Sequence, residues 1–167
     1  MKTLLSLLAG ALMINSAVQA ANLPAPTGDV VLVVTGNIKN TNKGDSAEFD
    51  MEMLEGLTEI SKTLETPWTE GTTAFSGPQL RAVLEEVGAR GSKLIVKALN
   101  DYSAEVPVED AENFDTMLAT KMNGDYMSVR DKGPLFLIYP FDTNPELFNE
   151  KYFSRSVWQI REVEVVE

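Results

Sequence analysis

The chemistry open to this chain is limited by the side chains that it lacks. Its 167 residues include neither cysteine nor histidine. Without cysteine there is no disulfide, no thiolate nucleophile and no thiolate ligand for a soft metal ion. Without histidine there is no Ser-His-Asp triad, no imidazole ligand and no proton shuttle tuned near neutral pH. Carboxylates, lysine, tyrosine and serine remain, and they are a small set for catalysis.

The charge balance excludes nucleic acid as a partner. The chain has 25 Asp and Glu against 14 Lys and Arg, a net charge of -11, which becomes -12 when Lys2 is removed with the N-terminal segment described next. A surface this negative repels phosphate backbones and anionic lipid head groups, and no basic run offsets it. The acidic surface either keeps the protein soluble or docks on a basic patch of a receptor.

The first 20 residues have the three parts of a cleavable secretion signal. Lys2 gives a positive start, residues 4–14 form an apolar run, and residues 17–20 are a compact exit. The run is too short for the roughly 20 residues that span a bilayer, and no cysteine follows it for lipid attachment. We therefore predict cleavage between Ala20 and Ala21, and a periplasmic, not membrane-embedded, single domain over residues 21–167.

The rest of the chain predicts many short strands and few short helices. The clearest helix is predicted from Ser76 to Gly88, with Pro78 in its first turn and one apolar face. Asp50 is predicted to cap another helix, and Asn123-Gly124 predicts a hairpin. Further short helices are predicted at 108–114 and 145–148, a loop at 36–47, and strands at 30–34, 60–66, 94–99, 102–106, 117–122, 126–129, 135–139 and 156–166. This pattern indicates an α+β, mainly β domain with mixed sheets.

Four segments carry a family resemblance: FSGPQLRAVLEEVGARG, LIVKALNDYSAEVPVEDAENF, MLATKMNGDYMSVRDKGPLFLIYP and YFSRSVWQIREVEV. Their most specific features are an Asn-Asp-Tyr turn, a Met-Asn-Gly hairpin, Lys-Gly-Pro before an apolar strand, and a Trp in the terminal strand. In this order, over about residues 60–167, they resemble the sulfite-oxidase-fold, molybdopterin-binding domain. The resemblance implies that fold.

The chain departs from the catalytic members of that family at one segment. Catalytic members bind molybdenum through a Cys before the Pro78 helix, and the corresponding stretch here, Lys62 to Trp68, has none. Threonine or leucine cannot replace a soft thiolate ligand. The resemblance is therefore to the small Cys-less versions, similar to periplasmic pterin-binding regulators of the PruR type.

Regulators of that type imply a specific function. They signal to an inner-membrane partner that makes or degrades cyclic di-GMP. We expect a non-catalytic sensor that binds a pterin without molybdenum. The alternatives are a molybdopterin-dependent oxidoreductase subunit and a ligand-free interaction scaffold.

A pterin needs an aromatic or guanidinium plane to stack on, and polar groups along its amide-like edge. The candidates for these roles are Trp68, Asn100, Asp101, Tyr102, Arg130, Asp131, Lys132, Arg155 and Trp158. Among them, Asp101 or Asp131 is assigned to accept two hydrogen bonds from the pterin edge.

Several candidates have an ordinary structural role as the alternative. Trp158 would pack in the core, Tyr102 would start a strand, and Arg155 would pair with an acidic neighbour. The Arg130-Asp131-Lys132 turn would simply be solvated, and Tyr139 is expected to belong to the core. Nothing local demands an indole at Trp68, so we expect its loss to leave the melting temperature unchanged.

Overall fold

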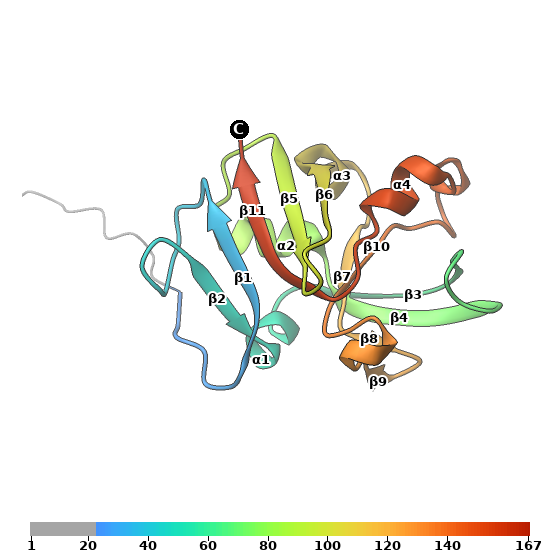
Figure 1. The fold of residues 1–167 in the computed structure, drawn as a ribbon, viewed down its shortest axis with the longest axis horizontal. Helices are drawn as coiled ribbons and strands as arrows, with labels where there is room; N and C mark the ends of the chain where they lie inside the picture. Colours follow the sequence, from blue (N-terminus) through green and yellow to red (C-terminus); the bar gives the residue numbers. More distant parts are fainter. Residues whose placement is uncertain (1–22) are drawn as a thin grey trace, which may run out of the picture.

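The chain folds into three β-sheets with short helices around them (Figure 1). The structure, a computed structural model, describes residues 23–167, so the predicted signal peptide and its cleavage site lie outside the described residues. It is a mainly β fold with mixed sheets and a few short helices, as the sequence predicts. In this part of the chain, no helix has the length and apolar character needed to cross a membrane.

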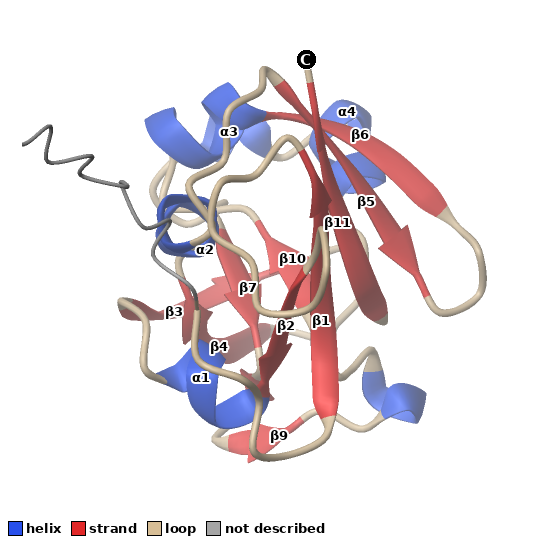
Figure 2. Cartoon of the chain, turned by 90° about the vertical axis from the view of Figure 1, so that its left-hand side faces the viewer, coloured by secondary structure: helices blue, strands red, loops and turns tan. Residues whose placement is uncertain are grey.

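The largest sheet has five strands in the order β2-β1-β11-β5-β6. They are β1 (Val30–Gly36), β2 (Ala47–Asp50), β5 (Lys93–Ala98), β6 (Ser103–Pro107) and β11 (Ile160–Val166). β1 and β11 run parallel and the other pairs are antiparallel. Figure 2 shows α2 (Leu80–Glu86) and α3 (Val108–Asn113) gathered on one side of this sheet. On the strands, Leu32, Val96 and Val163 are buried, which marks the face that forms the core.

Two smaller sheets complete the core. One contains β3 (Glu59–Glu65), β4 (Thr72–Pro78), β8 (Lys121–Met122) and β9 (Asp125–Tyr126), and the other pairs β7 (Met117–Ala119) with β10 (Phe136–Ile138). The predicted strand at 117–122 is thus divided at Thr120, and its halves join different sheets. β4 and β7 approach so closely that a Cβ at Gly77 would overlap the carbonyl oxygen of Leu118. Only glycine allows this contact.

The remaining short helices are α1 (Met51–Glu55), α4 (Glu150–Arg155), and the 3₁₀ turns η1 (Val129–Asp131) and η2 (Pro145–Leu147). The predicted cap of α1 is confirmed, because Asp50 accepts a hydrogen bond from the Met53 N–H. The hairpin at Asn123-Gly124 is also confirmed, with φ values of 53° and 88°.

The prediction of a helix from Ser76 was wrong. Residues 72–78 form strand β4, which pairs with the whole of β3, and the helix begins only at Leu80. Thr73, Phe75 and Gly77 are buried in alternation, which is the strand period. Pro78 ends the strand, where the ladder to β8 has already stopped at Ser76.

Other predicted element boundaries need similar corrections. Val129 lies in η1 and not in a strand, and β11 begins at Ile160 and not at Ser156. Gln159 has a φ of 52°, which interrupts extended backbone before that strand. Strand β2 and helix α4 were missed, because each is a short element in a segment with little periodicity.

Asp50 predicts how stability depends on pH. Its carboxylate accepts hydrogen bonds from the backbone N–H groups of Gly28, Met53 and Thr27, and these lower its pKa. A lowered folded-state pKa adds stability above the unfolded value near 4, and this stability is lost as the pH falls through it. We expect Asp50→Asn to lower the free energy of unfolding at pH 7, with a difference from wild type that shrinks towards pH 3.

Urea unfolding at a series of pH values measures this effect. Asp29→Asn, at an exposed neighbouring position, is the control and should leave the profile unchanged. A constant difference between Asp50→Asn and wild type from pH 7 to pH 3 would contradict the assignment.

Candidate functional site

One cleft brings together side chains from three distant parts of the chain. It has a volume of about 370 Å³, within the roughly 300–1,000 Å³ typical of small-molecule sites. Its lining residues are Trp68, Ala98, Asn100, Tyr102, Glu150, Phe153, Ser154, Ser156, Val157 and Trp158. Four of the nine residues proposed from the sequence are among them, namely Trp68, Asn100, Tyr102 and Trp158. We call this site the aromatic cleft.

Trp68 stands in the turn between β3 and β4. Its backbone N–H donates to the Thr66 hydroxyl at 3.2 Å, which fixes the turn. The indole packs edge-to-face on Phe136, Phe153 and Trp158, at centroid distances of 5.5, 5.7 and 5.8 Å. Nothing local in the sequence demands an indole here, but in the fold the indole packs against rings that are distant in sequence.

Trp158 precedes β11 and forms an isolated bridge with Phe136. Its ring is partly buried and packs against Phe136 at a centroid distance of 5.9 Å. The ammonium of Lys132 lies 5.0 Å from the indole centroid, a cation-π distance. Trp158 therefore both packs in the core and lines the cleft, and Lys132 reaches the site only through this ring.

The Asn100-Asp101-Tyr102 turn joins β5 to β6 and presents two of its three side chains to the cleft. The Asn100 side-chain oxygen accepts the Tyr102 N–H at 3.2 Å. Asp101 has a φ of 65°, and its carboxylate contacts Arg161 at 3.2 Å. Tyr102 is 48% exposed, and its hydroxyl donates to the Ser154 carbonyl at 2.9 Å. This hydrogen bond ties the turn to α4. Asp101, in contrast to its two neighbours, does not line the cleft.

Helix α4 forms a wall of the cleft that the sequence reasoning missed. It contributes Glu150, Phe153 and Ser154 to the lining. The Asn149 side chain caps it by accepting the Lys151 N–H at 3.0 Å. An Asn followed at once by Glu is a common helix start, and this signal could have revealed the element.

Arg155 lies in the same helix but points away from the cleft. Its guanidinium is 2.8 Å from the carboxylate of Asp110, which also accepts the Tyr139 hydroxyl at 2.6 Å. Burial, and then the bond to Asp110, raise the pKa of the Tyr139 phenol, so it stays a proton donor. The alternative that Arg155 pairs with an acidic neighbour is the one that the structure supports, and Tyr139 belongs to the core as expected.

Arg130 and Asp131 are exposed in turn η1 and do not line the cleft. Asp131 accepts the Ser128 hydroxyl at 2.8 Å. Neither Asp101 nor Asp131 therefore reaches a ligand in the aromatic cleft.

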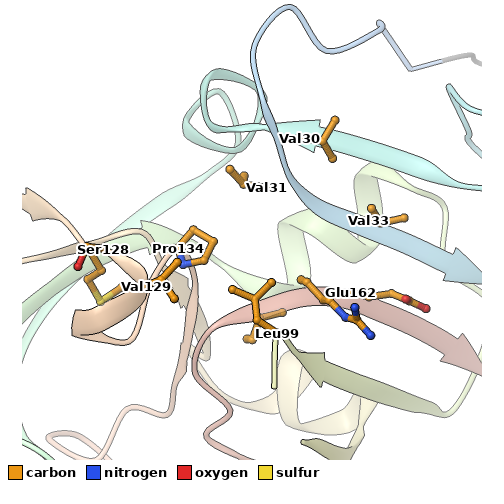
Figure 3. Close-up of a pocket in the computed structure, with 11 residues that line it drawn as sticks. Val30, Val31, Val33, Leu99, Ser128, Val129, Pro134 and Glu162 are labelled. Atoms are coloured by element: carbon orange, nitrogen blue, oxygen red, sulfur yellow. The ribbon is translucent and has the colours of Figure 1, made fainter. Parts of the chain in front are cut away.

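A second groove, of about 650 Å³, lies beside β1 and the start of β11 (Figure 3). It is lined mainly by aliphatic side chains, of which Val30, Leu99 and Val129 are 43%, 45% and 51% exposed. None of its lining residues is aromatic, and the single guanidinium plane in the lining, that of Arg161, is paired with Asp101. The aromatic cleft is therefore the better candidate site, although it is smaller.

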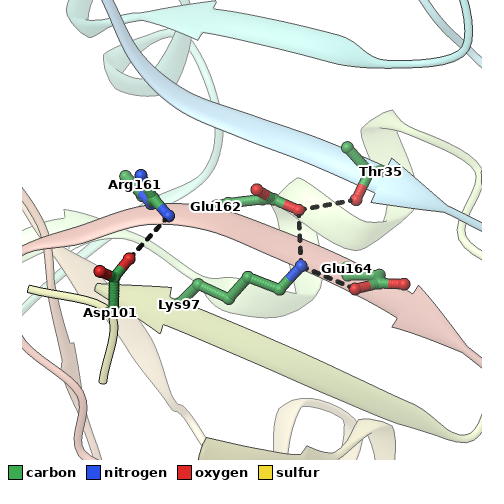
Figure 4. A network of polar contacts seen from close by, with 6 residues as sticks. All are labelled: Thr35, Lys97, Asp101, Arg161, Glu162 and Glu164. Atoms are coloured by element: carbon green, nitrogen blue, oxygen red, sulfur yellow. Dashed lines mark hydrogen bonds and ion pairs between the residues drawn. The ribbon is translucent and has the colours of Figure 1, made fainter. Parts of the chain in front are cut away.

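The outer face of the five-stranded sheet is held by charge pairs (Figure 4). The Lys97 ammonium lies 2.8 Å from Glu164 and 2.9 Å from Glu162. These two carboxylates raise the pKa of Lys97. Lys97 therefore has a structural role, and its ammonium is not available to bind an anionic partner on this face.

Comparisons with known proteins give a family and a fold. The model of the oxidoreductase molybdopterin-binding domain matches residues 40–166. Among solved structures, the chain is similar to the sulfane dehydrogenase SoxCD from Paracoccus pantotrophus, with a TM-score of 0.60 and 19% sequence identity. The match covers 81% of this chain but only 37% of that one, so the likeness shows the fold alone. No curated protein sequence matches this chain significantly.

Proposed function

Because this chain belongs to the oxidoreductase molybdopterin-binding domain family, we propose that its aromatic cleft binds a pterin and that the protein senses this ligand without oxidising a substrate. The observation that supports the proposal is the convergence of Trp68, Tyr102 and Trp158 on one cleft. Planar aromatic walls with a few polar groups suit a flat heteroaromatic ring.

The molybdenum-bearing form of the cofactor fits the cleft less well than the pterin ring. The chain has no thiol to bind the metal, and residues 23–167 contain no cluster of three or more His, Cys, Asp or Glu that could hold one. The single charged residue in the lining is Glu150, whose negative charge disfavours the phosphate group of a molybdopterin. We therefore propose a pterin without molybdenum as the ligand, and we derive no redox step.

The proposed sensor acts in the periplasm, after export by the predicted signal. Its partner would be an inner-membrane receptor that makes or degrades cyclic di-GMP. Helix α4 favours such a role, because it lines the cleft and also exposes Glu150, Lys151 and Ser154 to solvent. The net charge of -12 of the mature chain favours docking on a basic patch.

The ligand proposal is tested by analysing protein purified from the periplasm. We expect denaturation to release a fluorescent pterin and elemental analysis to find no stoichiometric molybdenum. Calorimetry on the emptied protein should then show binding of a reduced or an oxidised pterin. Stoichiometric molybdenum would favour an oxidoreductase subunit, and failure to bind any pterin would favour an interaction scaffold.

The signalling proposal needs a separate readout. Calorimetry between the pterin-loaded protein and the periplasmic domain of the receptor should show tighter binding than with the emptied protein, and a binding constant that falls with salt. Equal affinity in both states would leave a pterin-binding protein that does not report its ligand to that receptor.

A further inference from the structure

Glu150 is the one lining residue of the aromatic cleft that carries a formal charge. It occupies the first position of α4, next to the capping residue Asn149. Its carboxylate forms neither a hydrogen bond nor an ion pair with the side chains or backbone described here. A free anionic acceptor therefore lines a cleft that otherwise has no charged residue and four aromatic ones.

The side-chain hydroxyl groups of the lining and the Asn100 side-chain oxygen already have partners. The Asn100 oxygen accepts the Tyr102 N–H, and the Tyr102 hydroxyl donates to the Ser154 carbonyl. The Ser154 and Ser156 hydroxyls donate to backbone carbonyls of Lys151 and Tyr152, at 2.8 Å each. Glu150 thus has more unused capacity to accept hydrogen bonds than the side chains around it.

The two carboxylates that the sequence analysis assigned to this role have other partners, and so has the buried Asp110 beside α4. Asp101 contacts Arg161, and its side chain is 87% exposed outside the cleft. Asp131 is bound to Ser128, and Asp110 is bound to Arg155 and Tyr139. Among the described residues, Glu150 is the carboxylate placed to meet a ring that stacks on the cleft tryptophans.

We infer that Glu150 selects the ligand by accepting two hydrogen bonds from the adjacent 2-amino and ring N–H groups of a 2-amino-4-oxo pteridine. This inference rests on the proposed function and specifies its chemistry. A carboxylate with two acceptor oxygens matches two parallel donors, and such charge-assisted pairs are the stronger hydrogen bonds. A 2,4-dioxo ring presents a carbonyl in place of the amino group, and its oxygen faces the carboxylate as a second acceptor.

The pair pterin and lumazine tests this inference, because the two rings differ in having an amino or an oxo group at position 2. Calorimetry on the wild-type protein should show pterin bound roughly 10- to 100-fold more tightly than lumazine, the effect of one hydrogen bond to a charged group. For Glu150→Gln the preference should vanish or reverse, because the amide can accept from the ring N–H and donate to the lumazine oxygen.

Matched variants separate this role from a structural one. Asp101→Asn removes the rival carboxylate from the turn and should keep the wild-type preference. Glu146→Gln changes an acidic residue four positions before the first residue of α4 that bonds to Asn144, and it should also keep the preference. Melting curves should be close to wild type for Glu150→Gln, since Glu150 is exposed and pairs with no described residue.

The outcomes distinguish the inference from the proposed function. Pterin binding with the same preference in wild type and Glu150→Gln would overturn the role of Glu150 and leave the pterin proposal intact. If neither ring binds the wild type, the pterin proposal fails with it. Guanosine carries the same amino and N–H edge, so tighter binding of guanosine than of pterin would keep Glu150 in its role but overturn the pterin assignment.

Discussion

Replacing Arg155 by Met is expected to lower the free energy of unfolding by about 3 kcal/mol, the lower end of the values for breaking a buried ion pair. The side chain of its partner Asp110 is only 8% exposed, so the variant would leave a buried carboxylate with the Tyr139 hydroxyl as its remaining partner. The variant also loses the guanidinium that lies 5.4 Å from the Tyr152 ring centroid. Urea unfolding measures the loss.

The same change should weaken pterin binding, although Arg155 does not line the cleft. Arg155 ends α4, and its pair with Asp110 anchors this cleft wall to α3. Without the anchor, Glu150 and Phe153 would be positioned less well. Calorimetry should therefore show a lower affinity per folded molecule for Arg155→Met than for wild type.

A double variant shows whether the pair or the packing is responsible. Combining Arg155→Met with Asp110→Asn removes both charges and keeps a side-chain oxygen that accepts the Tyr139 hydroxyl, so no buried charge is left without its partner. We expect the double variant to recover much of the stability that either single change loses. Losses that simply add would show that the two residues are not coupled, and that the ion pair is not what holds α4.

The sequence allowed much of the fold to be predicted, because burial follows the local pattern in the longer elements. A run of apolar residues located β1, alternation located β3, and the Asn123-Gly124 turn located a hairpin. The short elements β2 and α4 were missed, since their apolar residues are too few to show a period. Strand β4 was mistaken for loop and helix because Pro78 suits a strand end as well as a helix start.

Only part of the candidate site was predicted, because the direction of side chains in turns cannot be derived from residue type. Residue type alone proposed Trp68, Tyr102 and Trp158 as stacking planes, and the fold brings these three side chains to one cleft. The direction of a turn side chain depends on backbone angles that composition does not reveal, so Asp101, with a φ of 65°, points to Arg161 instead. Glu150 could not be selected, because its helix had not been recognised.

Trp68→Ala is expected to affect both the fold and the site, in contrast to the sequence-based expectation of an unchanged melting temperature. Three aromatic rings pack against the indole, and replacing a large aromatic residue in such a setting by alanine costs about 3 kcal/mol. The loss of one stacking plane should also weaken pterin binding by up to roughly tenfold. Urea unfolding gives the first effect and calorimetry the second.

Trp68→Phe separates the two effects, because it keeps a plane at the cleft while it removes part of the packing. Its affinity for pterin should lie closer to wild type than that of Trp68→Ala, when both are corrected for the folded fraction. If Trp68→Ala kept wild-type stability, the indole would not be packed against Phe136, Phe153 and Trp158 as the structure has it. If its affinity per folded molecule were also unchanged, the pterin would have to stack elsewhere, and Trp158 and Tyr102 would be the remaining planes of the cleft. Unfolding and binding measurements on the same two variants therefore decide separately whether Trp68 supports the cleft and whether it touches the ligand.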